Sequence, residues 1–124
     1  MKRILFICLG NICRSPMAEA IMRKLVKEKG VAEEYEIDSA GLIGYHEGEG
    51  SDPRMKSHAY RRGYLLNHIS RPIRETDFDE FDHIICMDDS NWERLHRLAP
   101  TLEAAEKIER MTDYCRSHVI DHVP

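Results

Sequence analysis

The sequence predicts a single doubly wound α/β domain over residues 1–124, with a four-stranded parallel sheet and helices on both faces. Continuous apolar runs such as 2–8 (KRILFIC) and 83–87 (HIICM) are typical of buried parallel strands. Segments of helical periodicity alternate with these runs, and this alternation favours a parallel sheet. The length of 124 residues suits one domain with a hydrophobic core. Ligands of such folds bind at the carboxyl ends of the strands, which is where Cys8 falls.

The first half of the chain predicts a helix, a strand and a loop after the first strand. Ser15 can cap a helix that has Pro16 in its first turn and ends at Gly30. Residues 35–40 (YEIDSA) predict a second strand, and the glycine-rich stretch 41–51 predicts a long loop. The apolar positions that recur at helical spacing are Ala18, Ile21, Met22, Leu25 and Val26.

The chain from residue 52 onward predicts two further helices and a last strand. One helix is expected over 52–62, and the acidic stretch 77–82 predicts a turn of helix or a loop. After strand 83–87, a helix capped by Ser90 is expected over 90–98. A weak strand is expected near 107–111.

Several side chains in this part of the chain are expected to serve packing or solubility rather than chemistry. Cys86 ends an apolar strand and is expected to pack in the core. Trp92, Leu95 and Leu98 form the core-facing stripe of their helix. The charges of the FDEFD stretch, 78–82, are expected to face solvent.

Composition and charge narrow the class of function. The formal net charge of −4 argues against general binding to nucleic acid or to a membrane surface, because both need a basic face. We expect neither partner. The sequence shows no secretory signal and no long apolar span, so a cytoplasmic protein with reduced thiols is expected. Its cysteines are then candidates for chemistry or packing, and they are Cys8, Cys13, Cys86 and Cys115.

The turn CLGNICRS after the first strand combines a thiol with the features of an anion-binding loop. Gly10 and Asn11 tolerate the left-handed backbone that lets successive N–H groups curl around one point. Arg14 offers a bidentate fork for phosphate, and Ser15 can donate a hydrogen bond to the sulfur. The helix N-terminus and Arg14 favour the thiolate of Cys8.

This arrangement predicts a nucleophile at the base of a phosphate cradle. The thiolate would attack a phosphate monoester, form a phosphocysteine and release phosphate in a second step with water. Inorganic phosphate and other oxyanions should compete for the cradle. The cradle residues are Leu9, Gly10, Asn11, Ile12, Cys13, Arg14 and Ser15.

The same turn resembles the Cys-x5-Arg-Ser phosphate loop of low-molecular-weight protein tyrosine phosphatases. The resemblance extends along the chain through the segments SPMAEAIMRKL, DSAG, DPR, SRPI and FDHIICMDDSN. It implies a hydrolase that acts on phosphotyrosine proteins or small aryl phosphates, including acid phosphatase-like activity, with no cofactor. Cys8 would be the nucleophile, Arg14 the phosphate clamp, and Ser15 an aid to the thiolate.

The resemblance also implies supporting roles for other residues. Asn11, Ser39 and His68 match a hydrogen-bond network that holds the loop in shape. For Ser39 and His68, a strand-end serine and a surface histidine remain equally good interpretations. Cys13 matches a partner that forms a reversible, protective disulfide with Cys8, and otherwise fills space in the loop. The apolar rim for the substrate ring would be Leu9, Ile12 and Tyr45, where Tyr45 could equally be an exposed anchor.

The general acid that protonates the leaving group is not evident. The family carries it as an Asp in an Asp-Pro-Tyr-Tyr-like loop near the C-terminus, before a last helix, and both are expected to be lacking here. Asp52-Pro53 suits a helix start instead, which leaves Asp121 as a weak candidate. Either the sequence is part of a longer chain, or the protein turns over p-nitrophenyl phosphate but little phosphotyrosine peptide.

Two other functions and one metal site stay open as alternatives. A thiol-dependent arsenate reductase shares this type of loop but needs partner cysteines, and Cys86 and Cys115 are not closely spaced. A phosphate- or phosphotyrosine-binding module without turnover is the other alternative. His118 and His122 follow Cys115 at a metal-like spacing, yet a fourth ligand is not apparent and no metal is expected.

Overall fold

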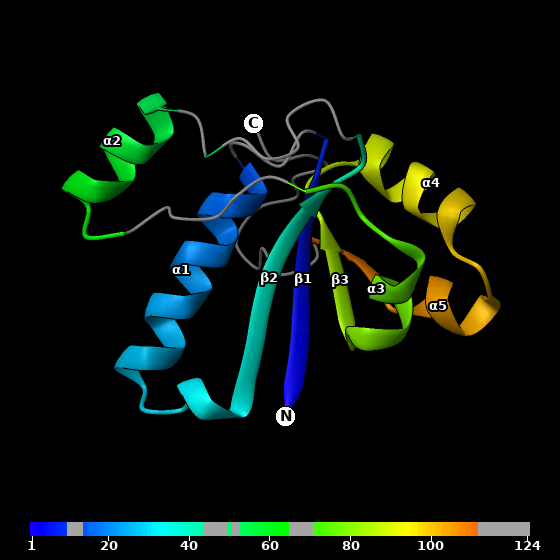
Figure 1. The fold of residues 1–124 in the computed structure, drawn as a ribbon, viewed down its shortest axis with the longest axis horizontal. Coiled ribbons are helices and arrows are strands. Elements are labelled where there is room, and N and C mark those ends of the chain that lie inside the picture. The colour runs from blue at the N-terminus through cyan, green and yellow to red at the C-terminus, as the bar shows by residue number, and fades with distance from the viewer. Residues whose placement is uncertain (10–13, 44–49, 51–52, 65–70, 112–124) are drawn as a thin grey trace.

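The computed structural model describes residues 1–9, 14–43, 50, 53–64 and 71–111, with helices around a parallel sheet (Figure 1). The strands follow the order β2-β1-β3-β4, and every neighbouring pair is parallel. This confirms the predicted fold class. The elements are β1 (Lys2–Cys8), α1 (Arg14–Glu28), the short 3-10 helix η1 (Ala32–Glu34), β2 (Tyr35–Gly41), α2 (Pro53–Arg61), α3 (Glu75–Glu80), β3 (His83–Cys86), α4 (Asp89–Leu98), α5 (Leu102–Glu106) and β4 (Ile108–Arg110).

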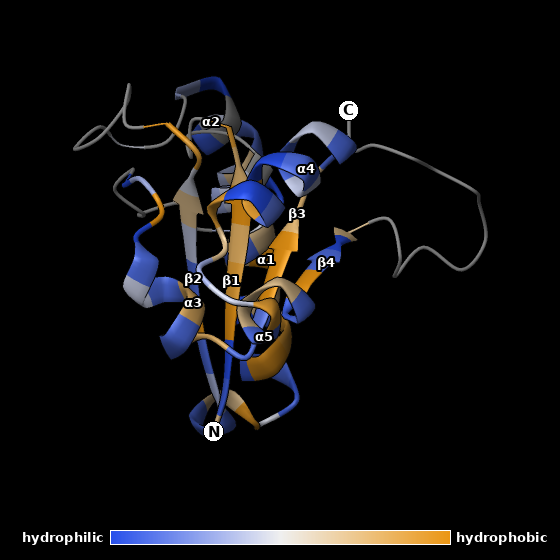
Figure 2. Cartoon of the chain, turned by 90° about the vertical axis from the view of Figure 1, so that its right-hand side faces the viewer, coloured by the Kyte–Doolittle hydropathy of each residue, from blue (hydrophilic) through white to orange (hydrophobic). Residues whose placement is uncertain are grey.

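The central strands β1 and β3 are the hydrophobic middle of the sheet (Figure 2). One face of the sheet packs against α3, α4 and α5, and Leu5 and Ile7 contribute to that core. The other face packs against α1, and it takes Ile4, Phe6 and Cys8 from alternate positions of the same strand. Because β1 is buried on both faces, its sequence is continuously apolar rather than alternating.

The strand register brings three segments together at the carboxyl edge of the sheet. Cys8 lies opposite Gly41 of β2, and Ile7 lies opposite Cys86 of β3. Cys86 is fully buried in the core, as expected. The candidate nucleophile therefore lies at the end of a central strand, which has β2 on one side and β3 on the other.

Several boundaries differ from the sequence-based expectation. Helix α1 begins at Arg14, so Ser15 lies inside its first turn rather than capping it. Helix α4 is capped by Asp88 and not by Ser90, because the Asp88 carboxylate accepts the N–H of Asn91 at 2.8 Å. Asp and Ser both favour N-cap positions, and Asp88 is the cap because its backbone is extended just before the helix begins.

Burial also corrects part of the side-chain assignment. Leu95 is fully buried and Trp92 is partly buried against the same core, but Leu98 is 51% exposed and lies off the core-facing stripe. The charges of 78–82 are exposed, as expected. Asp77, which precedes them in α3, is buried and forms an ion pair with Arg71.

Helix α2 lies next to the first turns of α1 (Figure 1). Ala20 of α1 and Ala59 of α2 form a small buried contact, with Met17 and Tyr64 packed at its margin. Within the described residues, no helix has the length and apolar character needed to cross a membrane.

Candidate active site

The Cys8 thiol lies at the junction between β1 and α1. Cys8 is 4% exposed, and its Sγ lies 2.9 Å from Oγ of Ser15, which is fully buried in the first turn of α1. Either atom of this pair can be the donor. When the sulfur is a thiolate, it can only accept, so the hydroxyl of Ser15 then donates the hydrogen bond.

The position of α1 adds an electrostatic contribution at the same place. The first N–H groups of a helix have no partner inside the helix, and they give its N-terminus a partial positive charge. Helix α1 has 15 residues and begins six residues after Cys8. Its N-terminal turn therefore favours an anion bound at this end of the helix.

The backbone just after the nucleophile is fixed by the segment that follows β2. The N–H of Leu42 donates to the carbonyls of Cys8 and Leu9 at 3.1 and 2.9 Å, and the N–H of Ile43 donates to Leu9 at 3.1 Å. These bonds hold the exit from β1 in one conformation. Leu9, the residue after Cys8, is 44% exposed.

A second polar cluster joins β2 to α1, and it contains a residue that sequence reasoning missed. Ser39 is fully buried on β2, and its Oγ donates to the carboxylate of Glu19 at 2.6 Å. Glu19 is only 4% exposed, and Arg23 donates to its second oxygen at 2.8 Å. Arg23 also donates to the Ile37 carbonyl. This buried carboxylate therefore has hydrogen-bond partners for both oxygens, as a buried charge requires.

Glu19 and Ser15 lie on one face of α1, one turn apart. The same helix face thus presents a hydroxyl to Cys8 and a carboxylate to Ser39. The sequence signal for Glu19 was its position among small and apolar residues, Ala18, Ala20 and Met22, where a charged side chain must be paired to be buried.

A third cluster anchors the segment 71–73 to the same edge of the sheet. The N–H of Gly41 donates to the Arg71 carbonyl at 2.8 Å, and the N–H of Ile73 donates back to Gly41 at 2.7 Å. The Arg71 guanidinium lies 2.9 Å from a carboxylate oxygen of Asp77 and 3.1 Å from one of Asp38. Segment 71–73 thus extends the pairing at the end of β2, two residues from Ser39.

The charge state of Arg71 follows from its surroundings. Burial alone would lower the pKa of Arg71, but the hydrogen bond and charge of Asp77, together with those of Asp38, outweigh burial and raise the pKa above its ordinary value. The guanidinium therefore stays charged wherever the protein is folded, and the buried Asp77 keeps its counter-ion.

The structure describes only part of the predicted site. Cys8, Leu9, Ser15 and Ser39 lie together near the carboxyl edge of the sheet, and Glu19 joins them. Outside the described residues lie Gly10, Asn11, Ile12, Cys13, Tyr45, His68, Cys115, His118, Asp121, His122 and the side chain of Arg14. The roles expected for these residues stay predictions. Among the side chains that are described, no group of three or more His, Cys, Asp or Glu is placed to hold a metal ion.

The geometry supports nucleophilic chemistry on an anion. It combines a thiol at a strand end, a hydroxyl donor within hydrogen-bond distance, and the N-terminus of a long helix. Such a site suits nucleophilic attack by the sulfur on an anionic group.

Comparison with known proteins gives a consistent result. A family model described as low molecular weight phosphotyrosine protein phosphatase matches residues 3–123. The human low molecular weight phosphotyrosine protein phosphatase is 44% identical over 114 residues, which cover 91% of this chain and 72% of that protein. A low molecular weight protein-tyrosine-phosphatase of Streptomyces coelicolor is 43% identical over 112 residues, which cover 90% of this chain and 68% of that protein.

Solved structures agree with the sequence comparison. A protein tyrosine phosphatase from Entamoeba histolytica, crystallised with Hepes in its active site, superimposes with a TM-score of 0.96 at 43% identity. The match covers 100% of this chain and 79% of that one.

Proposed function

Because this chain belongs to the low molecular weight phosphotyrosine protein phosphatase family, whose members are cysteine-dependent hydrolases, we propose that Cys8 is the nucleophile with which it hydrolyses phosphotyrosine monoesters. The observation that carries this assignment is the 2.9 Å contact between Cys8 Sγ and Ser15 Oγ at the start of α1. A buried thiol with only a packing role needs neither the hydroxyl nor the helix N-terminus.

The reaction proceeds in two displacements at phosphorus. The Cys8 thiolate attacks, a sulfur–phosphorus bond forms, and the ester oxygen leaves with the electron pair of the broken bond and takes up a proton. Water then attacks the phosphorus, an oxygen–phosphorus bond forms, the sulfur–phosphorus bond breaks with its electron pair going to Cys8, and inorganic phosphate is released after the water loses a proton. Ser15 stabilises that thiolate as nucleophile and as leaving group, because its hydroxyl donates a hydrogen bond to the sulfur in both steps.

The remaining roles follow the family pattern. Arg14 clamps the equatorial phosphate oxygens with the backbone N–H groups of 9–15, and Leu9, Ile12 and Tyr45 line the entrance for the substrate ring. Phosphotyrosine proteins and small aryl phosphates are the substrates, and inorganic phosphate competes with them. Asp121 is the candidate general acid.

A support network holds the phosphate loop in its reactive shape. Ser39 belongs to it with Asn11 and His68, and the carboxylate of Glu19 anchors Ser39 at 2.6 Å. Cys13 protects Cys8 by a reversible disulfide, which makes the enzyme redox-regulated. A nucleophile of this kind must be kept reduced, which suits the cytoplasm.

The test uses Cys8→Ser with Cys86→Ala as the matched control. We expect Cys8→Ser to abolish hydrolysis of p-nitrophenyl phosphate and of a phosphotyrosine peptide, while binding of inorganic phosphate persists. Cys86 is fully buried on β3 and takes no part in the chemistry, so Cys86→Ala should keep its turnover. Unchanged hydrolysis by Cys8→Ser would refute the assignment. A phosphoenzyme burst without turnover in the unmodified protein would indicate the binding module instead.

A further inference from the structure

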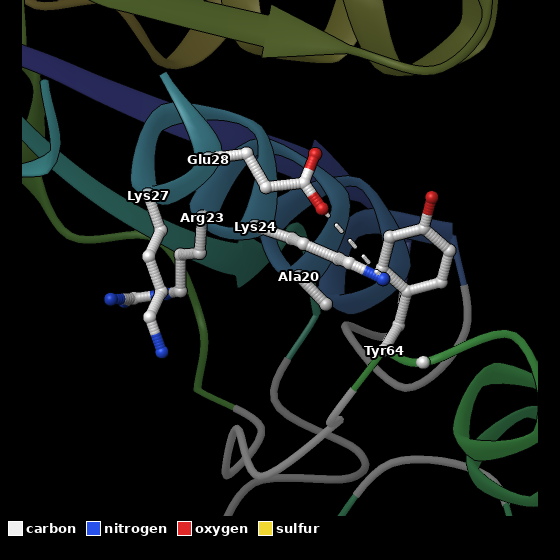
Figure 3. Close-up of a pocket in the computed structure, with 7 residues that line it drawn as sticks. Ala20, Arg23, Lys24, Lys27, Glu28 and Tyr64 are labelled. Carbon is white, nitrogen blue, oxygen red and sulfur yellow. Dashed lines mark ion pairs between the residues drawn. The ribbon is translucent and has the colours of Figure 1, made fainter. Parts of the chain in front are cut away.

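A groove of about 600 Å³ runs along the outer side of α1, between this helix and the residues that follow α2 (Figure 3). Cations dominate its lining: Arg23, Lys24 and Lys27 from α1 face one carboxylate, that of Glu28. The aromatic ring of Tyr64 closes one end. This local excess of positive charge stands on a chain whose formal net charge is −4.

The cations of the groove differ in how far they are already paired. Arg23 is committed to Glu19, and the ammonium of Lys24 lies 4.0 Å from Glu28 and 4.8 Å from the centre of the Tyr64 ring. Among the described residues, the Lys27 ammonium has no carboxylate within ion-pair distance. Figure 3 shows Lys24 directed toward Tyr64, whereas Lys27 points toward the other end of the groove beside Arg23. An anionic ligand would therefore find charge at both ends.

Gly63 leaves space for the Lys24 ammonium beside the Tyr64 ring. Gly63 has a φ of +84°, which favours glycine, and a Cβ at this position would lie 2.7 Å from the Lys24 ammonium. The absence of a side chain at Gly63 thus lets Lys24 reach the face of Tyr64, where a cation is stabilised. The arrangement places the Lys24 ammonium over the Tyr64 ring at the end of the groove.

The groove lies further along the same helix whose first turn contacts Cys8. Helix α1 leads from the active site into the groove, since Lys24 and Lys27 follow Ser15 by nine and twelve residues. At 1.5 Å of rise per residue, these positions are about 14 and 18 Å further along the helix axis. An extended peptide covers about 3.3 Å per residue, so this axial distance corresponds to about four to six residues of substrate.

We propose that this groove, formed by α1 and Tyr64, is an accessory site that binds acidic side chains of the phosphoprotein substrate, about four to six residues from the phosphotyrosine. The inference rests on the proposed function, because it places the phosphotyrosine itself at Cys8. It names the preferred substrate as a phosphotyrosine within an acidic segment. Charge complementarity, rather than apolar burial, provides the selectivity.

The test compares two phosphotyrosine peptides that differ only at positions four to six residues from the phosphotyrosine, on both sides. One peptide carries Glu there and the other carries Gln. Binding is measured by fluorescence anisotropy on protein carrying Cys8→Ser, so that turnover does not interfere, and competition by inorganic phosphate reports occupancy of the phosphate site. The variant Lys24→Gln/Lys27→Gln removes two groove charges. Its control, Lys29→Gln/Lys56→Gln, removes two exposed charges that do not line the groove.

We expect the Glu peptide to bind about fivefold more tightly than the Gln peptide at low salt, because exposed ion pairs each contribute modestly. The groove variant should bring this ratio close to one, the control should preserve it, and added salt should reduce it. Hydrolysis of p-nitrophenyl phosphate by both double variants without Cys8→Ser should stay within about twofold of the unmodified enzyme, since that substrate is too short to reach the groove.

Equal binding of the two peptides by the parent protein would overturn the accessory site, as would an equal loss of selectivity in the control. Failure of the proposed function is distinguishable from these results. It would appear as no turnover of p-nitrophenyl phosphate by the unmodified enzyme, together with peptide binding that inorganic phosphate does not displace.

Discussion

Replacing Arg71 by alanine should destabilise the protein by about 3 kcal/mol, because the substitution leaves a buried carboxylate without its counter-ion. The guanidinium contacts Asp77 at 2.9 Å and Asp38 at 3.1 Å, and Asp77 is only 3% exposed. Removing one partner of a buried ion pair costs about 3–5 kcal/mol. The lower end applies, since Asp77 still accepts the N–H of Arg74 at 2.7 Å.

Urea unfolding followed by circular dichroism measures this loss, which should also lower the Tm by about 12 °C for a domain of this size. Arg71→Ala/Asp77→Asn should recover about 1–2 kcal/mol, because the uncompensated charge is gone. Asp38→Asn should cost less than about 1 kcal/mol, since Asp38 is partly exposed. A cost of about 0.5 kcal/mol or less for Arg71→Ala, or no recovery in the double variant, would show that this reasoning is wrong.

The raised pKa of Arg71 also determines how the stability difference between the unmodified protein and Arg71→Ala depends on pH. A cationic group whose pKa is higher in the folded protein contributes stability that is fully present below its unfolded pKa and is lost only as the pH rises through the folded pKa. Both values lie far above neutrality. Arg71 therefore keeps its charge in both states between about pH 6 and 9. Its titration should add no pH dependence to this stability difference in that range.

Five further substitutions, grouped into three predictions, test the site, the cap of α4 and the packing of α4 against the core. Ser15→Ala should lower kcat for p-nitrophenyl phosphate by about 10- to 100-fold, because a hydrogen bond to a thiolate contributes about 1.5–3 kcal/mol; an unchanged kcat would remove Ser15 from the chemistry. Asp88→Ala should cost about 1 kcal/mol in urea unfolding and Ser90→Ala less than about 0.5 kcal/mol, and the reverse order would restore Ser90 as the cap. Leu95→Ala should cost about 3 kcal/mol, whereas Leu98→Ala should cost less than about 1 kcal/mol, and equal costs would contradict the different burial of the two side chains.

The parts of the fold that the sequence predicts are those with a local signal. The strands β1 and β3 are apolar at nearly every position, so their burial on both faces is evident from the sequence. Helix α5 carries no comparable signal, because five residues provide little more than one turn of periodicity. The cap of α4 also depended on backbone conformation, since Asp88 and Ser90 are both suitable residue types.

The residues of the site also differ in whether the sequence carries a local signal for them. Cys8 and Ser15 lie seven positions apart in one motif, so their contact was accessible to sequence reasoning. Glu19 and Asp77 were missed because the partners that allow their burial lie elsewhere in the chain or on another element. Glu19 needs Ser39, 20 residues away on β2, and Asp77 needs Arg71, which precedes α3. A buried charge is predictable only when its partner can be identified, and that pairing is set by the fold.

The most direct test of the central claim is to trap the covalent intermediate. The enzyme is mixed with p-nitrophenyl phosphate, quenched with acid within the first turnover, digested and analysed by mass spectrometry. We predict one phosphoryl group on the peptide that contains Cys8, and its absence in Cys8→Ser. Phosphate on another residue, or turnover by Cys8→Ser without any phosphoenzyme, would contradict the assignment of Cys8 as the nucleophile.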